Sequence, residues 1–437
     1  MNHRHVGVVG GGFSGTLLAI HLLRGGAEVT LIERAPRVAR GVAYSTPHAD
    51  HLLNVRASGM SAFPDDPSHF VRWLEDRSEA GPDSFAQRRL YGTYLEELLE
   101  AAAAKDRLRR IHGEAVAIAR GETGELIRLA DGEVVACEAA VLAVGNLPPG
   151  ASGIYAGMPD HIYVADPWSG NLAEGLEEGD TVLLIGTGLT AIDAALILDS
   201  ARFAGPILAL SRRGLVPRAH AAPAKVEALD APPPPRASAL LRSVREAAAR
   251  IGWRSAVDQL RPVTQSLWAS APIAERLRFL RHLRPWWDVH RHRIAPQIAE
   301  RIERMERAGQ LTFGAGKIVS CNLDGNQAQV AWRPRGSEEV AELRVRRIVN
   351  CTGPEANVAR ADEALLRNLV GSDRLRADPC RIGIDIDAES RVVDAKGLAS
   401  PTLFCVGPMT RGAWWEIVAV PDIRSQVAAL AHRLLAA

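Results

Sequence analysis

Two short stretches constrain the fold of this 437-residue chain more than any other feature, because each joins an apolar run to a glycine-rich turn. The first is VGVVGGGFSG, residues 6–15, and the second is VLLIGTGLTA, residues 182–191. A strand, a tight glycine turn and a helix in this order are typical of a dinucleotide-binding unit, in which backbone amides and the helix N-terminus face a pyrophosphate. The sequence therefore predicts an α/β fold with two Rossmann-like dinucleotide-binding domains.

The first turn has the spacing G-x-G-x-x-G at Gly10, Gly12 and Gly15, and the following strand, AEVTLIE, ends at Glu33. A carboxylate about 20 residues after the turn accepts both hydroxyls of an adenosine ribose and repels a 2′-phosphate. We therefore expect FAD or NAD in this unit, rather than NADP. The predicted contacts are Gly10, Gly12, Phe13, Ser14, Gly15, Glu33 and Arg34.

The second turn repeats the pattern at Gly186 and Gly188, with Ala191 in the third position. Its next strand, PILALS, is followed by two arginines where the first unit has an acid. Guanidinium groups give charge-assisted, bidentate hydrogen bonds to a 2′-phosphate, so the pattern favours NADPH over NADH. The alternative is a solvated basic turn. The predicted contacts are Gly186, Gly188, Leu189, Thr190, Ser211, Arg212 and Arg213.

The composition excludes several classes of protein. The net charge of +1 gives no overall attraction to nucleic acid or membrane, and no run approaches the length of a membrane-spanning helix. The five cysteines form no CxxC pair and no spacing typical of a metal site, so we expect no metal. Free cysteines and the absence of a signal peptide predict a cytoplasmic protein.

A carboxylate in the first unit and arginines in the second resemble the two-dinucleotide-binding flavoproteins, in which the first unit binds FAD and the second NAD(P)H. The segments AVLAVGN (140–146) and IVNCTGP (348–354) look like the crossovers between their domains. The resemblance implies an FAD-binding domain in two parts, 1–165 and 346–437, around an NAD(P)H-binding domain, 166–345. It also adds Gly145, Gly353 and Gly407 to the predicted cofactor contacts.

Several longer segments, such as GVAYST (41–46) and GPMTRGAWWEIVAVPDIR (407–424), resemble bacterial FAD/NAD(P)-binding proteins of largely unassigned activity. In the first domain, the runs DP-x-x-F-x-x-W-L and R-x-x-Y-x-x-Y-L are similar to those of flavin N-hydroxylases that act on ornithine and lysine. The flavin disulfide reductases carry a cysteine pair at the flavin, and this chain has none. Thiol–disulfide chemistry is therefore not expected.

A Pro/Ala-rich linker follows His220, and amphipathic helical patterns then fill residues 236–310, which are rich in arginine and carry four tryptophans. We interpret this segment as a helical insertion in the second domain. If it covers the crevice where nicotinamide meets flavin, its Trp and Arg side chains suit a planar or anionic small-molecule substrate. The alternative is a helical cap with solvated arginines and tryptophans in its core.

No catalytic residue is assigned from the sequence, but five residues are candidates for the flavin edge. Trp415 and Glu416 lie just after a Thr-Arg-Gly turn that precedes a helical pattern, and a helix N-terminus stabilises negative charge on a reduced flavin. Asn54, Met60 and Ser61 are the candidates for the other side of the ring. For the tryptophan, the alternative is a place in the hydrophobic core.

The sequence thus predicts an FAD-dependent, NADPH-using oxidoreductase, in which the cofactor carries the chemistry. The favoured function is a monooxygenase that uses molecular oxygen to hydroxylate a nitrogen, another heteroatom or a carbon through a C4a-peroxyflavin. The alternative is a NAD(P)H-dependent reductase or dehydrogenase that passes electrons to a quinone, imine or protein acceptor. A third possibility is a non-catalytic sensor that retains FAD for its structure. The sequence leaves homo-oligomer formation open.

Overall fold

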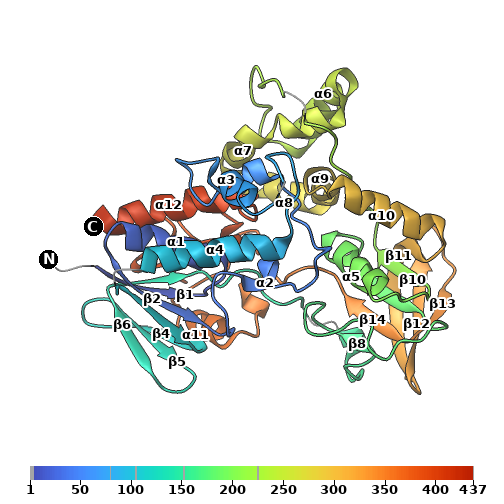
Figure 1. Cartoon of the computed structure of the whole chain (residues 1–437), viewed down its shortest axis with the longest axis horizontal. Coiled ribbons are helices and arrows are strands. Elements are labelled where there is room, and N and C mark those ends of the chain that lie inside the picture. Colours follow the sequence, from blue (N-terminus) through green and yellow to red (C-terminus); the bar gives the residue numbers. More distant parts are fainter. Residues whose placement is uncertain (1–3, 79, 104–105, 151–152, 224–225, 437) are drawn as a thin grey trace.

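The computed structural model describes residues 4–78, 80–103, 106–150, 153–223 and 226–436. Two separate β-sheets, each covered by helices, flank a group of further helices (Figure 1). The predicted α/β fold with two Rossmann-like domains is confirmed. The residue limits given above for these domains stay predictions.

The first sheet has six strands in the order β15-β16-β7-β1-β2-β3. All of its neighbouring strands pair in parallel except β15 and β16. The two halves of the predicted FAD-binding domain therefore meet in one sheet, since β7 pairs with β16. The strands are β1 (His5–Val9), β2 (Glu28–Glu33), β3 (Leu108–His112), β7 (Ala139–Leu142), β15 (Arg391–Val393) and β16 (Ala399–Cys405).

Successive side chains of β1 enter two different cores, as expected for a strand buried on both faces. Val8 packs in a core that includes residues of α1, α4 and α12. Val9 packs in a core with a three-stranded sheet and α11. The helices are α1 (Phe13–Arg24), α2 (Gly41–Tyr44), α3 (His69–Glu75), α4 (Arg88–Ala103), α11 (Ala364–Gly371) and α12 (Val420–Ala436), and the small sheet is β4 (Ala115–Arg120), β5 (Glu125–Leu129) and β6 (Val134–Cys137).

The second sheet has seven strands in the order β13-β12-β11-β10-β9-β14-β8. Strands β8, β14, β9, β10 and β11 are parallel, and β12 and β13 continue the edge in antiparallel pairing. Helices α5 (Leu189–Ser200) and α10 (Pro296–Arg307) share a core with this sheet. The strands are β8 (Tyr163–Val164), β9 (Val182–Ile185), β10 (Ile207–Ser211), β11 (Leu311–Asp324), β12 (Gln327–Pro334), β13 (Ala341–Val345) and β14 (Arg347–Asn350).

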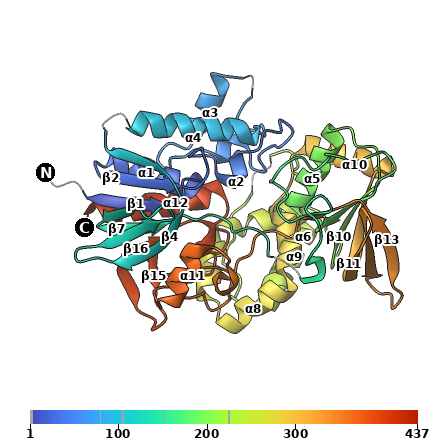
Figure 2. The same cartoon turned by 90° about the horizontal axis from the view of Figure 1, so that it is seen from below.

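The predicted insertion forms helices α6 (Ala237–Asp258), α7 (Thr264–Ser270), α8 (Ile273–His282) and α9 (Arg284–Arg291) between β10 and α10. These helices lie between the two sheets (Figure 2). Their apolar side chains share a core with Cys380, Ile382 and Trp415 of the first domain. The insertion is thus connected in sequence to the second domain, but its apolar side chains pack on the first domain.

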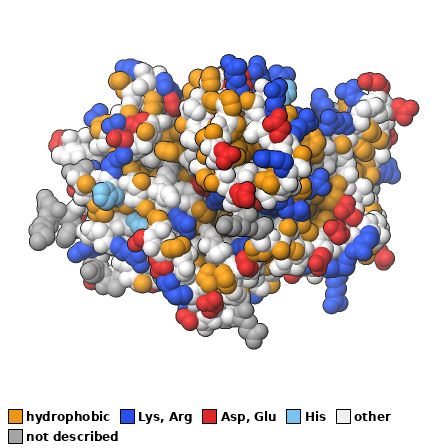
Figure 3. Space-filling view, turned by 90° about the horizontal axis from the view of Figure 1, so that it is seen from above, with side chains coloured by type: hydrophobic (Ala, Val, Ile, Leu, Met, Phe, Trp, Pro, Cys, Tyr) orange, Lys and Arg blue, Asp and Glu red, His pale blue; other side chains and the backbone are white. Residues whose placement is uncertain are grey.

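Arginines of the insertion differ in their surroundings. Arg242, Arg245 and Arg250 of α6 are exposed. One face of the molecule carries such basic side chains interspersed with acidic and hydrophobic ones (Figure 3). The α9 arginines, Arg284 and Arg291, are more buried and lie close to carboxylates. Across the described residues, no helix is long and apolar enough to cross a membrane.

A buried ion pair links the small sheet to the segment after α11. Glu125 is fully buried, and Arg374 donates to both of its carboxylate oxygens at 2.7 and 2.8 Å. Removing one partner of such a pair leaves a buried charge uncompensated, which costs about 3–5 kcal/mol.

We expect Glu125→Ala to lower the free energy of unfolding by about 3 kcal/mol or more, measured as a shift of the urea midpoint by circular dichroism. The matched control is Glu133→Ala, which removes a more exposed ion pair, that of Glu133 with Arg109. This change should cost less than about 1 kcal/mol. Equal shifts in the two variants would contradict the structural role of the buried pair.

Candidate functional site

The first glycine turn presents free backbone donors at the start of α1. Its N-cap residue, Gly12, makes no side-chain capping bond, and the first turn of α1 has no acidic residue. Beside it, the Glu33 carboxylate accepts the backbone N–H of Gly11 at 2.6 Å and that of Ala35 at 2.8 Å. The positive end of a helix next to a carboxylate suits the pyrophosphate and the adenosine ribose of a dinucleotide. The residues of this turn therefore fit FAD.

Segments distant in sequence meet at this turn. Gly407, at the end of the first sheet, has φ +83°, and a Cβ there would collide with the Ser14 hydroxyl. Gly407 is therefore packed directly on α1. Phe13 contacts Tyr44 edge-on, with ring centroids 6.1 Å apart. Arg34 points elsewhere, since its guanidinium forms an exposed ion pair with Glu363 at 2.8 Å.

The second glycine turn opens on a cavity of about 970 Å³ between the second sheet and the insertion. All the contacts predicted for the second unit line this cavity, together with one crossover glycine and two flavin-edge candidates. They are Gly186, Gly188, Leu189, Thr190, Ser211, Arg212, Arg213, Gly353, Trp415 and Glu416. Elements of both domains and the insertion therefore share one cavity.

The two glycines of the turn have different structural roles. Gly186 has φ +122°, and a Cβ there would collide with the Cys351 carbonyl. Gly188 is the N-cap of α5, has φ −86° and would place a Cβ in open space, with no atom within 4 Å. Gly186 is thus required by the fold, whereas Gly188 leaves room for a ligand at the positive end of a helix.

The cations near this turn also have different roles. Arg213 donates to the backbone carbonyls of Arg281 and His282, both at 3.2 Å, so it holds the C-terminal end of α8. Arg212 is exposed at the cavity, where Lys317 and Arg335 accompany it. Sequence reasoning missed these two residues. The strand register is the feature that brings Lys317 to this turn, because Ser211 of β10 pairs with Ala315 of β11, two residues before Lys317.

At the inner end of the cavity, Glu416 joins the first domain to α9. The Trp287 indole N–H donates to its carboxylate at 2.6 Å, Arg291 lies 2.9 Å from it and His292 lies 3.4 Å from it. Burial raises the pKa of Glu416, but His292, Arg291 and Trp287 outweigh this effect and hold it at about 2. The carboxylate is therefore ionised and surrounded by Trp287, Arg291 and His292. This suits a structural link between the first domain and the insertion better than a proton acceptor.

The remaining flavin-edge candidates lie outside the cavity lining. Met60 belongs to the core of the first domain, and the Ser61 hydroxyl donates to the Asp66 carbonyl at 2.6 Å. The Asn54 carbonyl lies 3.0 Å from Nε2 of His220. Their predicted place at the flavin stays a prediction. Among the described residues, no group of three or more potential ligands forms a metal site.

The contrast between the two glycines gives a direct test of the cavity. We expect Gly188→Val to leave the melting temperature and the bound FAD unchanged, because a Cβ at this position has no protein atom within 4 Å. It should weaken NADP⁺ binding by about ten-fold or more, measured by titration calorimetry, because it fills the space at the helix N-terminus. Gly186→Val is the matched control and should fail to fold stably. Unchanged NADP⁺ affinity in Gly188→Val would exclude this turn as the coenzyme site.

Comparison with known proteins agrees with these features. A family model described as FAD-NAD(P)-binding matches residues 7–147, so the first unit is a domain of this kind. No curated protein sequence matches the chain.

Solved structures share the fold over nearly the whole chain. An ornithine hydroxylase from Pseudomonas aeruginosa is 17% identical with a TM-score of 0.68, covering 99% of each chain. An L-lysine 6-monooxygenase from Pseudomonas syringae is 17% identical with a TM-score of 0.67, covering 99% of this chain and 100% of the other. A cadaverine monooxygenase from Erwinia amylovora, bound to FAD, is 12% identical with a TM-score of 0.67, covering 100% and 94%. The resemblance to flavin N-hydroxylases is thus confirmed at the level of the fold.

Proposed function

We propose that this protein is an FAD-dependent, NADPH-using monooxygenase that acts on a small molecule. The observation that carries the proposal is the single cavity, which begins at the second glycine turn and ends at Trp415 and Glu416 of the first domain. A dinucleotide that binds by its pyrophosphate at Gly188 has space to extend toward the FAD-binding domain. Solved structures named as ornithine, lysine and cadaverine hydroxylases have this fold, which supports the same reaction class here.

When bound, FAD supplies the redox chemistry with NADPH and dioxygen. The residues of this chain bind, orient and shield the reactants. Residues 12–14 and Glu33 hold the dinucleotide of the first unit, and α5 holds that of the second. Trp268 and Trp287 of the insertion are buried against the end of the cavity at Trp415, which excludes water from that wall.

We assign the 2′-phosphate of NADPH to Arg212, Lys317 and Arg335, since all three line the same cavity. Arg213 is assigned instead to the attachment of α8. The sequence had placed both arginines at the phosphate, and the hydrogen bonds favour a division of roles between them.

This assignment predicts a selective loss. We expect Arg212→Gln and Lys317→Gln each to raise the KM for NADPH by about ten-fold or more, with little change for NADH, because a charge-assisted contact to the phosphate contributes about 1.5–3 kcal/mol. The measurement is steady-state NAD(P)H oxidation. Arg213→Gln is the matched control and should affect both coenzymes alike. Equal losses for both coenzymes in Arg212→Gln would refute the assignment.

The reaction class is tested by rapid mixing. The purified protein is reduced with NADPH without oxygen, mixed with oxygenated buffer and followed by absorbance. We expect a transient absorbing species, distinct from reduced and oxidised flavin, before the flavin reoxidises. Direct return to oxidised flavin, or no reaction with oxygen, would favour a reductase that passes electrons to another acceptor. Failure of NADPH to reduce the flavin would favour a non-catalytic role.

We also propose a cytoplasmic location. All five cysteines are free and buried, which suits a reducing compartment. Burial raises the pKa of Cys351 and Cys405, so neither thiol is activated as a nucleophile. This agrees with a reaction that depends on the flavin rather than on thiols.

A further inference from the structure

Arg411 is a largely buried cation that forms no close ion pair, although the carboxylates of Asp288, Glu416 and Asp378 favour its charge from a longer distance. It lines the inner end of the cavity, and burial lowers its pKa to about 10. In the described part of the chain, no carboxylate lies within ion-pair distance of Arg411, and its buried Nε has no hydrogen-bond partner. A buried charge is costly unless it is paired, so this guanidinium suits an anion that enters the cavity.

The phosphates of the coenzymes have other donors. The pyrophosphates of FAD and NADPH are assigned to the N-termini of α1 and α5, and the 2′-phosphate to Arg212 and its neighbours. The residues assigned to the 2′-phosphate lie in the second domain, whereas Arg411 follows β16 of the first sheet. With the coenzyme phosphates assigned to other donors, Arg411 is available to a third ligand.

The carboxylates of the cavity do not suit a cationic substrate. Asp288 and Glu416 are the acidic residues that line it, against several arginines and a lysine. Glu416 is held by Arg291 and His292, and Asp288 lies 3.3 Å from Arg284. Neither carboxylate is free to pair with an amine. The cavity thus has an excess of positive charge, which disfavours the diamine-like cations named for the structural neighbours.

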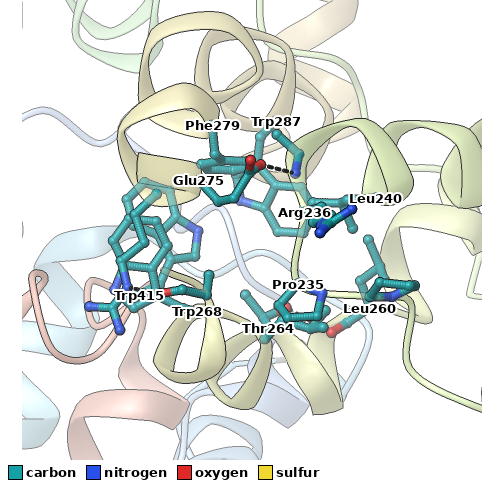
Figure 4. A pocket seen from close by; sticks show the side chains of 15 residues that line it. Pro235, Arg236, Leu240, Leu260, Thr264, Trp268, Glu275, Phe279, Trp287 and Trp415 are labelled. Carbon is teal, nitrogen blue, oxygen red and sulfur yellow. Dashed lines mark hydrogen bonds between the residues drawn. The ribbon is translucent and has the colours of Figure 1, made fainter. Parts of the chain in front are cut away.

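A second, apolar pocket of about 60 Å³ lies behind Trp415, which lines both spaces. Trp268 stacks on Trp415 with ring centroids 4.7 Å apart, and Phe279 and Trp287 complete the aromatic wall (Figure 4). The Trp268 indole N–H donates to the carbonyl of Gly412, next to Arg411, at 2.8 Å. Trp415 therefore lines the large cavity with apolar surface, and the insertion packs on it from behind.

We propose that the substrate is a small organic carboxylate with a short apolar part, whose carboxylate binds Arg411 and whose hydrocarbon contacts Trp415, since both residues line the large cavity. This inference rests on the proposed function and specifies the substrate class of the same site. Arg411 is the anchor that sets the preference for an anion, and the buried tryptophans set the preference for an apolar chain.

The test uses the FAD-loaded, full-length protein and three probes of the same shape: 4-methylpentanoate, 4-methylpentanol and 4-methylpentylamine. Binding is followed by tryptophan fluorescence and by the flavin absorbance spectrum. We expect the carboxylate to bind about ten-fold or more tightly than the alcohol and the amine, as charge-assisted hydrogen bonds predict. Equal affinity for the three probes, or tighter binding of the amine, would overturn the proposal without any variant.

Variants then locate the site. Arg411→Gln should weaken 4-methylpentanoate binding by about ten-fold or more and change the Kd of NADP⁺ by less than about two-fold. Arg250→Gln removes an exposed arginine of α6 and is the matched control for the loss of one positive charge. If Arg411→Gln loses FAD, Arg411→Lys is measured, and it should keep the preference for the carboxylate over the amine. Loss of NADP⁺ affinity with unchanged carboxylate binding would assign Arg411 to the coenzyme and overturn the proposal.

The outcome is separable from that of the proposed function. Flavin reduction by NADPH is recorded on the same preparation without any probe. A protein that binds the carboxylate but is not reduced would refute the oxidoreductase, whereas a protein that is reduced but does not distinguish the probes would refute only the substrate class.

Discussion

Burial of the insertion against residues 412–416 is the interaction on which the rest of the site depends. The insertion belongs to the second domain by sequence, yet its tryptophans pack on Trp415 and hydrogen-bond to Gly412 and Glu416. The large cavity is lined by both domains and by the insertion that this contact holds in place. The buried charge of Glu416 is compensated locally, since Trp287 donates to it and Arg291 and His292 lie within 3.4 Å of it.

The two glycines of the second turn meet different requirements, one set by the packing of the fold and one by the space for a ligand. A glycine whose absent Cβ would meet protein, such as Gly186, serves the packing of a turn. At Gly188 the absent Cβ would point into open space beside the N-terminus of α5, which leaves room for a bound molecule. The same sequence pattern therefore contains two different requirements, and only coordinates separate them.

The fold was predictable from sequence, and so was the grouping of the second-unit residues around one turn, because both follow from local pattern. Apolar strands, glycine turns and helical periodicity are readable along the chain, and the second-unit residues indeed line one cavity. Lys317 was not predictable in this way, because it lies about a hundred residues from Arg212 and approaches it only through the pairing of β10 with β11. The roles of Arg213 and Glu416 depend on carbonyl and indole partners in the insertion, and spacing gives no information about those. Met60 was a candidate for the flavin edge because of its position in the chain, and its side chain lies in the hydrophobic core of the first domain.

The attachment of α8 to the turn after β10 has a consequence for the order of events. Arg213 stands beside Arg212 in the chain, yet it ends on the carbonyls of Arg281 and His282. A coenzyme that orders this turn therefore also orders the helix that closes the far side of the cavity. Affinities linked through one shared element are reciprocal, so any change that the coenzyme makes in the affinity for the third ligand is matched by an equal change in the affinity for the coenzyme. Occupancy of one site is in this way communicated to the other without any change in the sheets.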